Sequence, residues 1–181
     1  MLTGLPFETT SLAELGLTSP EETGASFLDN ALLKARHAAA LSGCAAIADD
    51  SGIEVDALGG APGIHSARYA GSGASDAANN AKLLHALADV PPEACHARYH
   101  CALVFIDAAD AQPLVAEASW EGIILASPRG TGGFGYDPYF WLPDLGKTAA
   151  ELEPGEKNRL SHRARAMLAL RGMLTLREAG A

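Results

Sequence analysis

Two neighbouring apolar segments, 99–106 and 114–125, give the clearest indication of how this chain folds. The first is a continuous apolar run and the second alternates between apolar and polar residues, patterns that are typical of β-strands. We expect the two strands to pair as a hairpin. Before them, Ser26 with Asp29 resembles a capping box that opens a helix to about Leu41. Since helices and strands alternate unevenly, the sequence predicts an α/β fold with a mixed sheet.

Shorter elements complete the predicted fold. A buried strand from Cys44 to Ala48 should end in the turn-like segment 49–52, and 53–58 is a further candidate strand. We also expect a helix capped by Ser75, a short aromatic strand at 139–141, and a C-terminal helix capped by Ser161 that runs to about Glu178. The chain has 181 residues, enough for one sizeable core, so we expect a single domain over 1–181.

Charge and composition narrow the functional classes. The formal net charge is −9, which disfavours a non-specific nucleic-acid binder because such proteins are usually basic. No apolar stretch reaches the length of a membrane span, and the first residues lack the basic start and apolar run of a signal peptide. The three cysteines do not form a disulfide framework, so we expect reduced thiols and a cytoplasmic location.

Adjacent carboxylates at Asp49 and Asp50 form the first candidate catalytic feature. If a strand continues through them, the two side chains point to opposite faces, and one of them can face a ligand. A carboxylate there suits Mg²⁺, a cation that prefers oxygen ligands, or a general base for water. A simple Asp-Ser-Gly turn is the alternative. The acidic turn at 21–24 could supply a second carboxylate, or could be a solvated turn.

A glycine-rich segment, 130–138, is the second candidate. Its first six residues match G-x-G-x-x-G, but that dinucleotide motif must open a helix, which Pro138 and the aromatic residues after it disfavour. No Gly-Lys-Ser/Thr follows, so the segment is not a P-loop. Glycines let the backbone approach a ligand closely, and the rings of Phe134 and Tyr136 could stack on a base. A tight hairpin loop with packed aromatic side chains is the alternative.

Cations concentrate near the C-terminus, where six of the 13 Lys and Arg residues lie between Lys157 and Arg177. Lys157 and Arg163, with His162, surround the predicted start of the last helix, where positive charge opposes the helix dipole. A helix N-terminus with added cations is a good anion site, so we expect a phosphate or an electron-rich base edge as partner. A solvated basic helix face is the alternative.

Seven segments occur in one order along nearly the whole chain. They are EETG (21–24), FLDNALLKA (27–35), IADDSGIEVD (47–56), GGAPGIHSARYAG (59–71), GTGGFGYDP (130–138), GKTAAEL (146–152) and EKNRLSHR (156–163). Each motif is weak alone, but together they resemble the inosine/xanthosine triphosphate pyrophosphatases, the Ham1-like family. The resemblance implies an elongated, mixed-sheet α/β fold with two lobes around a central nucleotide cleft, usually as a homodimer, without a nucleic-acid or membrane partner.

The resemblance also implies a reaction and a set of site residues. Non-standard purine triphosphates such as ITP, dITP and XTP would be hydrolysed to the monophosphate and pyrophosphate with Mg²⁺ as cofactor. Glu22 and Asp50 would hold Mg²⁺, and Asp50 would accept the proton of the attacking water. The implied substrate contacts are Ser51 to the nucleotide, Lys34 and Lys157 to the phosphates, Phe134 stacked on the base, Gly135, Tyr136 and Asp137 around it, and His162 and Arg163 to its edge. Donors aimed at a 6-oxo group disfavour adenine, which carries a 6-amino group.

One feature of the family is missing. Nothing before Glu21 matches the first strand and the Ser/Thr-x-Asn-x-x-Lys loop with which the family normally begins. Either the natural protein starts upstream, or the chain is short, and we then expect weak triphosphate binding and low stability. Two other functions stay open: a non-catalytic nucleotide-binding or dimerisation module, and a different Mg²⁺-dependent hydrolase of the dUTP type that prefers pyrimidines.

Overall fold

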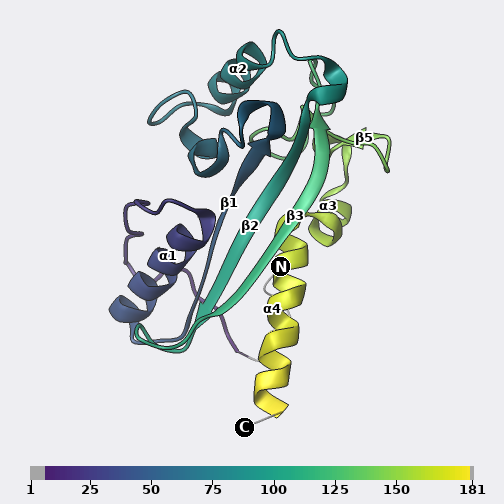
Figure 1. The fold of residues 1–181 in the computed structure, drawn as a ribbon. Helices are drawn as coiled ribbons and strands as arrows, with labels where there is room; N and C mark the ends of the chain where they lie inside the picture. Colours follow the sequence, from purple (N-terminus) through teal and green to yellow (C-terminus); the bar gives the residue numbers. More distant parts are fainter. Residues whose placement is uncertain (1–6, 180–181) are drawn as a thin grey trace. The chain divides into compact units, whose positions relative to one another are not determined.

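The computed structural model describes residues 7–179 (Figure 1). The expectation that the first six residues are not part of a signal peptide lies outside the described residues. The expectation that the family's first strand is missing before Glu21 stays a prediction. The helices and strands are, in chain order, α1 (Phe27–Ser42), β1 (Ala46–Val55), α2 (Asp76–Ala86), β2 (His96–Ile106), β3 (Leu114–Ile124), β4 (Phe140–Leu142), β5 (Lys147–Thr148), α3 (Pro154–Leu160) and α4 (His162–Ala179). No helix within residues 7–179 combines the length and the apolar character needed to cross a membrane.

Within residues 7–179, five strands form one sheet whose order, β1-β2-β3-β4-β5, is the order of the chain. β3 pairs with β4 in antiparallel register, with Ile123 opposite Trp141, and β4 pairs with β5 in the same sense. The α/β class and the pairing of β2 with β3 are confirmed, but the sheet is antiparallel rather than mixed. For two of the pairs the reason lies in the connections, because links as short as those from β2 to β3 and from β4 to β5 cannot form the crossover that parallel neighbours need.

β1 runs unbroken from Ala46 to Val55, so the expected division into two strands around a turn at 49–52 is wrong. Pairing with β2 outweighs the local turn preference of Asp-Ser-Gly, since the stability of a strand depends strongly on its neighbours in the sheet. Asp49 and Asp50 therefore lie within a strand, and their side chains point to opposite faces. Because successive side chains of a strand alternate between its faces, the carboxylates of Asp49 and Asp50 have different partners.

α1 and α2 begin where the sequence signals lie. Ser26 Oγ accepts a hydrogen bond from the N–H of Asp29 (3.1 Å), and Ser75 caps α2 in the same way. Gly43 closes α1 in the left-handed conformation, with φ of 68°. Both helix starts are thus confirmed.

The C-terminal helix is preceded by α3, a short helix that we did not predict. Pro154 occupies its first turn, where proline favours a helix start, and the extended backbone of Ser161 (φ −66°, ψ 161°) separates α3 from α4. Lys157, which we expect near the start of the last helix, therefore lies on a helix of its own, α3. His162 and Arg163 do begin α4.

The chain divides into two compact units, and each is described by itself. The first unit comprises Met1–Ser51, Cys101–Ala118 and Arg163–Ala181, and the second comprises Gly52–His100 and Ser119–His162. The expectation of a single domain stays a prediction.

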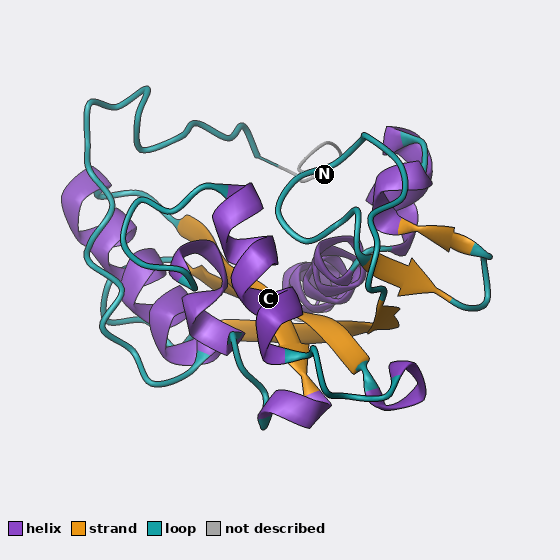
Figure 2. Ribbon diagram, turned by 90° about the horizontal axis from the view of Figure 1, so that it is seen from above, coloured by secondary structure: helices purple, strands orange, loops and turns teal. Residues whose placement is uncertain are grey.

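Each unit has its own apolar core. In the first unit, α4 packs on β2 and β3 through Ala166, Met167, Leu170 and Leu174, which meet Cys101, Leu103, Phe105 and Ala116. This helix runs beside the strands in Figure 1 and is seen end-on in Figure 2. In the second unit the buried residues Leu83, Tyr99 and Phe140 belong to one core cluster, which joins α2 to the strands.

Candidate active site

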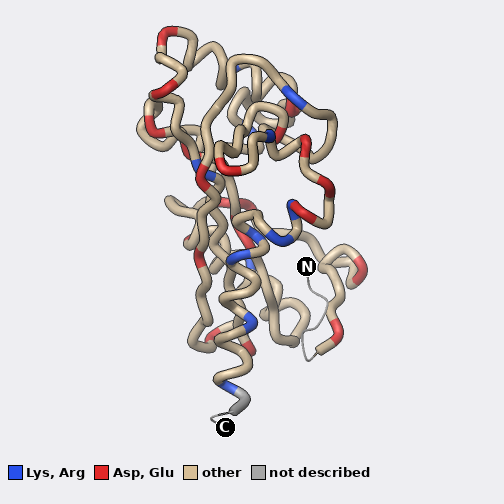
Figure 3. Tube along the Cα trace, turned by 90° about the vertical axis from the view of Figure 1, so that its right-hand side faces the viewer, with Lys and Arg blue, Asp and Glu red and all other residues tan. Residues whose placement is uncertain are grey.

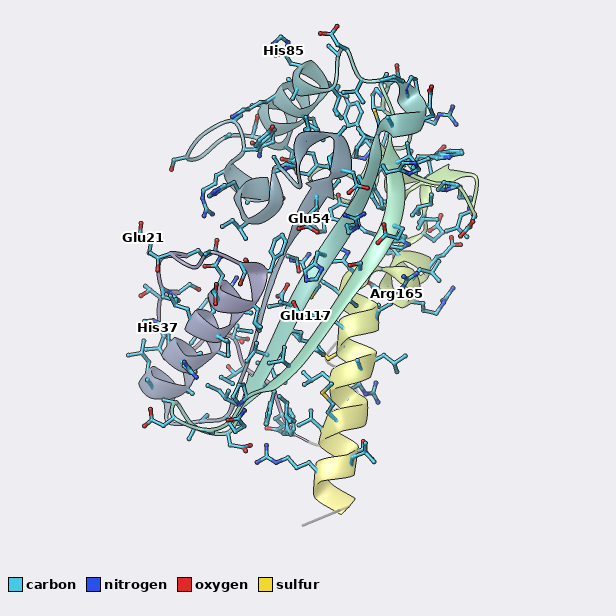
Figure 4. The ribbon with its side chains drawn as sticks, in the orientation of Figure 1. Glu21, His37, Glu54, His85, Glu117 and Arg165 are labelled. Carbon is cyan, nitrogen blue, oxygen red and sulfur yellow. The ribbon has the colours of Figure 1, made fainter. Side chains whose placement is uncertain are left out.

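Glu22, Lys34 and Asp50 lie together in the first unit, and we call them the acidic cluster. The ammonium Nζ of Lys34 lies 3.0 Å from Oε1 of Glu22 and 2.9 Å from Oδ1 of Asp50. The three residues come from the turn before α1, from α1 and from β1. Figure 4 shows the neighbouring Glu21 pointing outward from that turn, so Glu22 is the glutamate that faces the cluster.

Asn30 on α1 holds the acidic cluster together. Its side chain is fully buried; Nδ2 donates to Oδ2 of Asp50 (3.1 Å), and Oδ1 accepts from the N–H of Gly24 (2.8 Å). A Cβ at Gly24 would lie 2.7 Å from Oδ1 of Asn30, so the turn approaches this amide closely only because it carries a glycine. One amide thus joins the turn that carries Glu22 to the strand that carries Asp50.

The two carboxylates of the acidic cluster are suitable ligands for Mg²⁺. Burial lowers the pKa of Lys34, but its hydrogen bonds to Asp50 and Glu22 outweigh burial and raise the pKa above its ordinary value. Two carboxylates already converge on one cation, and Mg²⁺ is usually held by one or two carboxylates, with water and phosphate as its other ligands. Residues 7–179 contain no group of three or more His, Cys, Asp or Glu that could hold a metal. The acidic cluster therefore fits a metal shared with substrate rather than an all-protein cage.

Asp49 pairs with Arg163, at the start of α4. Arg163 Nε and Ser51 Oγ each donate to Oδ2 of Asp49 over 2.9 Å. Burial raises the pKa of Asp49, but the charge and hydrogen bond of Arg163 outweigh burial, so the pKa lies below its ordinary value. The pair borders a pocket of about 680 Å³ whose other walls include Cys101 and Met167. Figure 3 shows basic positions spaced along α4 rather than gathered at its start.

Asp137 is the centre of a second cluster, in the second unit. It is only 1% exposed, and Oδ1 accepts a hydrogen bond from the hydroxyl of Tyr99 (3.1 Å). Oδ2 accepts from the backbone N–H of Phe134 (2.8 Å) and forms an ion pair with Lys157. Burial, followed by the negative charge of Asp137, raises the pKa of Tyr99 well above its ordinary value, so this hydroxyl stays a donor. The carboxylate thereby fixes the glycine-rich loop and Lys157 to the core.

The two aromatic residues of the glycine-rich loop have different surroundings. Phe134 is 60% exposed, and Nζ of Lys157 lies 4.4 Å from the centre of its ring. Tyr136 is buried, and its hydroxyl donates to the carbonyl of Ser66 (2.8 Å). The expectation that both rings can stack on a base is therefore wrong for Tyr136, whose ring belongs to the core of the second unit. Phe134 keeps an accessible ring.

His162 is also part of the second unit. It is buried, and its ring stacks on Tyr99 with a centroid separation of 4.9 Å and an interplanar angle of 12°. The phenol that bonds to Asp137 thus also supports His162. In this way the second unit brings together Phe134, Gly135, Tyr136, Asp137, Lys157 and His162. In the first unit Glu22, Lys34 and Asp50 meet on one face of β1, whereas Ser51 and Arg163 meet at Asp49 on the opposite face.

We did not predict two residues of these clusters, Asn30 and Tyr99. Asn30 lies on the buried face of α1 with Phe27 and Ala31, and an amide at such a position is a usable signal because buried polar groups are hydrogen-bonded. Tyr99 lies in an apolar strand, where its sequence context is that of an ordinary core residue.

Comparison with protein families and curated proteins gives consistent matches. A model of the Ham1 family matches residues 1–173. A dITP/XTP pyrophosphatase from Shigella flexneri is 54% identical over 168 residues, which are 92% of this chain and 85% of that protein. A dITP/XTP pyrophosphatase from Xanthomonas campestris pv. campestris (strain 8004) is 54% identical over 175 residues, 96% of this chain and 88% of that protein.

Solved structures give the same result for the fold. A HAM1 protein from Coxiella burnetii superposes with a TM-score of 0.91 at 43% identity, covering 96% of this chain and 89% of that chain. The Ham1 protein of Staphylococcus aureus superposes with a TM-score of 0.84 at 40% identity, covering 91% of this chain and 84% of that chain.

Proposed function

We infer the function from one premise, that this chain belongs to the Ham1 family, and propose that it hydrolyses ITP, dITP and XTP to the monophosphate and pyrophosphate. The observation that supports this activity most directly is the convergence of Glu22 and Asp50 on one cation. Attack at phosphorus needs positive charge held beside the phosphate oxygens, and a pair of carboxylates is a means of holding it.

Mg²⁺ is the proposed cofactor, with Glu22 and Asp50 as its ligands. When bound, it would offset the negative charge that develops on the phosphate oxygens. Lys34 now bridges the same two carboxylates, so its ammonium would have to give way to a metal held by both. Its release would make Lys34 available to the phosphates, the role that we also propose for Lys157.

Asp50 is the proposed acceptor of the proton of the attacking water. Each of its oxygens accepts one hydrogen bond, from Lys34 and from Asn30, and each keeps a further lone pair. The bond from Asn30 does not depend on Lys34 and holds the carboxylate in one direction, which a general base requires because it must lie within hydrogen-bonding reach of the water. We propose that Ser51, the next residue, contacts the nucleotide.

Phe134 is the proposed stacking partner of the purine, because its ring is exposed and lies in a loop held by Asp137. Gly135, Tyr136 and Asp137 are proposed to complete the base pocket. His162 and Arg163 are proposed to donate to the 6-oxo group of hypoxanthine or xanthine. Adenine has a 6-amino group in that position, so its binding would leave these donors unpaired.

Asp50→Asn separates this enzyme from the alternative, a nucleotide-binding module without catalysis. The substitution keeps the size of the side chain but removes the base, so we expect pyrophosphate release from XTP to fall by roughly 10²- to 10⁴-fold. XTP binding, measured by calorimetry, should change much less. Asp144→Asn is the control, because Asp144 is exposed. A chain that binds XTP but releases no pyrophosphate in the unmutated form would favour the binding module.

Three further expectations stay predictions. They are the homodimer, which light scattering after size-exclusion chromatography tests, the cytoplasmic location, and the elongated, two-lobed arrangement around a nucleotide cleft. A panel that includes dUTP tests the pyrimidine-preferring alternative.

A further inference from the structure

Two residues of α2 bond to both sides of one glycine in the glycine-rich loop. Oδ2 of Asp76 accepts a hydrogen bond from the N–H of Gly135 (2.6 Å), and Nδ2 of Asn80 donates to the carbonyl of Gly135 (2.9 Å). Asp76 and Asn80 are four residues apart and so lie on the same face of the helix. Asn80 Nδ2 also donates to the carbonyl of Asp76 (2.9 Å), which ties the two together. We call Asp76 and Asn80 the α2 clamp.

The two bonds act on the peptide planes on either side of Gly135. Its N–H belongs to the planar unit shared with Phe134, and its carbonyl belongs to the planar unit shared with Tyr136. Holding both planes sets φ and ψ of Gly135, which has a left-handed φ of 61°. The direction in which the Phe134 side chain leaves the backbone follows from the first of these planes.

Phe134 needs such support because its ring is mostly exposed. Its own N–H is bonded to Asp137 on one side, and the peptide that follows it is bonded to Asp76 on the other. Tyr136 is anchored separately through its hydroxyl and the carbonyl of Ser66. An exposed aromatic ring is thus carried by a backbone that is fixed before and after it.

Asn80 has one side-chain atom whose burial disfavours folding. Its Oδ1 is buried and has no hydrogen-bond partner within the described residues. A buried unpaired oxygen disfavours folding, so an asparagine here is a poor choice for helix stability alone. Local rules of this kind are commonly broken at functional sites.

We propose that Asp76 and Asn80 are positioning residues that set the orientation of Phe134 for purine recognition. This inference rests on the proposed function and extends it to residues that do not themselves contact the substrate. In this proposal α2 contributes to purine recognition through its two hydrogen bonds to the backbone of Gly135.

The test compares two clamp variants with a stability control. In Asp76→Ala and Asn80→Ala we expect KM for XTP to rise roughly five- to tenfold, the effect of one hydrogen bond, with kcat changed less than about threefold. Asp76→Asn keeps an acceptor oxygen and should restore KM to within about twofold. Ser75→Ala removes the N-cap of α2, whose Oγ accepts from the N–H of Ala78, but keeps both bonds to Gly135, so KM should not change.

A second readout does not depend on turnover. Exchange of the Gly135 amide hydrogen, followed by NMR, should accelerate in Asp76→Ala but not in Ser75→Ala, because only the first loses the acceptor. The double variant of Asp76 and Asn80 should raise KM by less than the product of the single effects, since both act on one residue.

The possible outcomes distinguish a failure of the proposed hydrolysis from a failure of the α2 clamp. Absence of XTP hydrolysis by the unmutated chain would overturn the proposed function. With hydrolysis present, an unchanged KM in both clamp variants would overturn the clamp. An equal rise in Ser75→Ala would also overturn it, because α2 would then act only through its stability. A rise confined to the clamp variants, with rescue by Asp76→Asn, would establish it.

Discussion

Asn30 on α1 and Asp50 on β1 are joined by a buried hydrogen bond of 3.1 Å from Nδ2 to Oδ2. The other end of the same amide accepts from Gly24, so Asn30 connects both carboxylate-bearing segments of the acidic cluster. Both oxygens of the proposed general base are thereby bonded, one to an amide and one to an ammonium.

Asn30→Ala should lower the free energy of unfolding by about 2–3 kcal/mol. The change leaves an oxygen of Asp50 and the N–H of Gly24 without their partner and opens a small cavity. Urea denaturation measures the loss. Asn158→Ala is the control because Asn158 is exposed. Equal stability of the two variants would contradict the role assigned to Asn30.

Lys34→Met should strengthen the binding of Mg²⁺ in the absence of nucleotide by roughly three- to tenfold. The ammonium now lies between Glu22 and Asp50, and its removal leaves two carboxylates with no cation between them. Titration calorimetry measures the affinity, with Lys147→Met as the control for loss of an exposed lysine charge. Weaker or unchanged Mg²⁺ binding would show that the metal does not use these carboxylates.

Asp49→Asn should lower the free energy of unfolding more at neutral pH than at acidic pH. The folded-state pKa of Asp49 lies below its ordinary value, so its stabilising effect is fully present above the unfolded value of about 3.9 and is lost as pH falls through the folded pKa. Denaturation at pH 7 and at pH 3 should give a larger difference between variant and unmutated chain at pH 7. The same difference at both pH values would contradict the pairing with Arg163.

Gly133→Ala should destabilise the chain more than Gly135→Ala. Both glycines have positive φ, 73° and 61°, so both variants carry the left-handed strain of about 1–2 kcal/mol. A Cβ at Gly133 would also lie 2.1 Å from Oδ2 of Asp137, whereas at Gly135 it would meet nothing within 4 Å. Thermal unfolding of both variants tests the difference, and equal melting temperatures would refute the close packing of Asp137 against the loop.

Local signals predicted the elements that depend on local interactions. Ser26 and Gly43 bound α1 through contacts within a few residues, and β2 and β3 show their pairing in their own apolar patterns. The sequence does not predict the full length of β1, because its continuity through Asp50 depends on the neighbouring strand, which no local pattern encodes.

The candidate site was predictable in its residue types but not in its contacts. The sequence indicated Asp50 and Phe134, yet the amide that holds Asp50 and the phenol that holds Asp137 come from segments distant in the chain. Similarly, the sequence places Lys157 near the start of the last helix but does not reveal its partner, a buried carboxylate of the glycine-rich loop. Such long-range pairs require the fold, since spacing along one element does not reveal them.

The decisive experiment for the proposed hydrolysis of non-standard purine triphosphates is pyrophosphate release by this 181-residue chain, measured with Mg²⁺ and XTP beside an equal concentration of ATP. We expect rapid release from XTP and little from ATP, because the proposed donors to the 6-oxo group have no partner on adenine. Release from ATP at the same rate as from XTP, or no release from either by a folded chain, would contradict it.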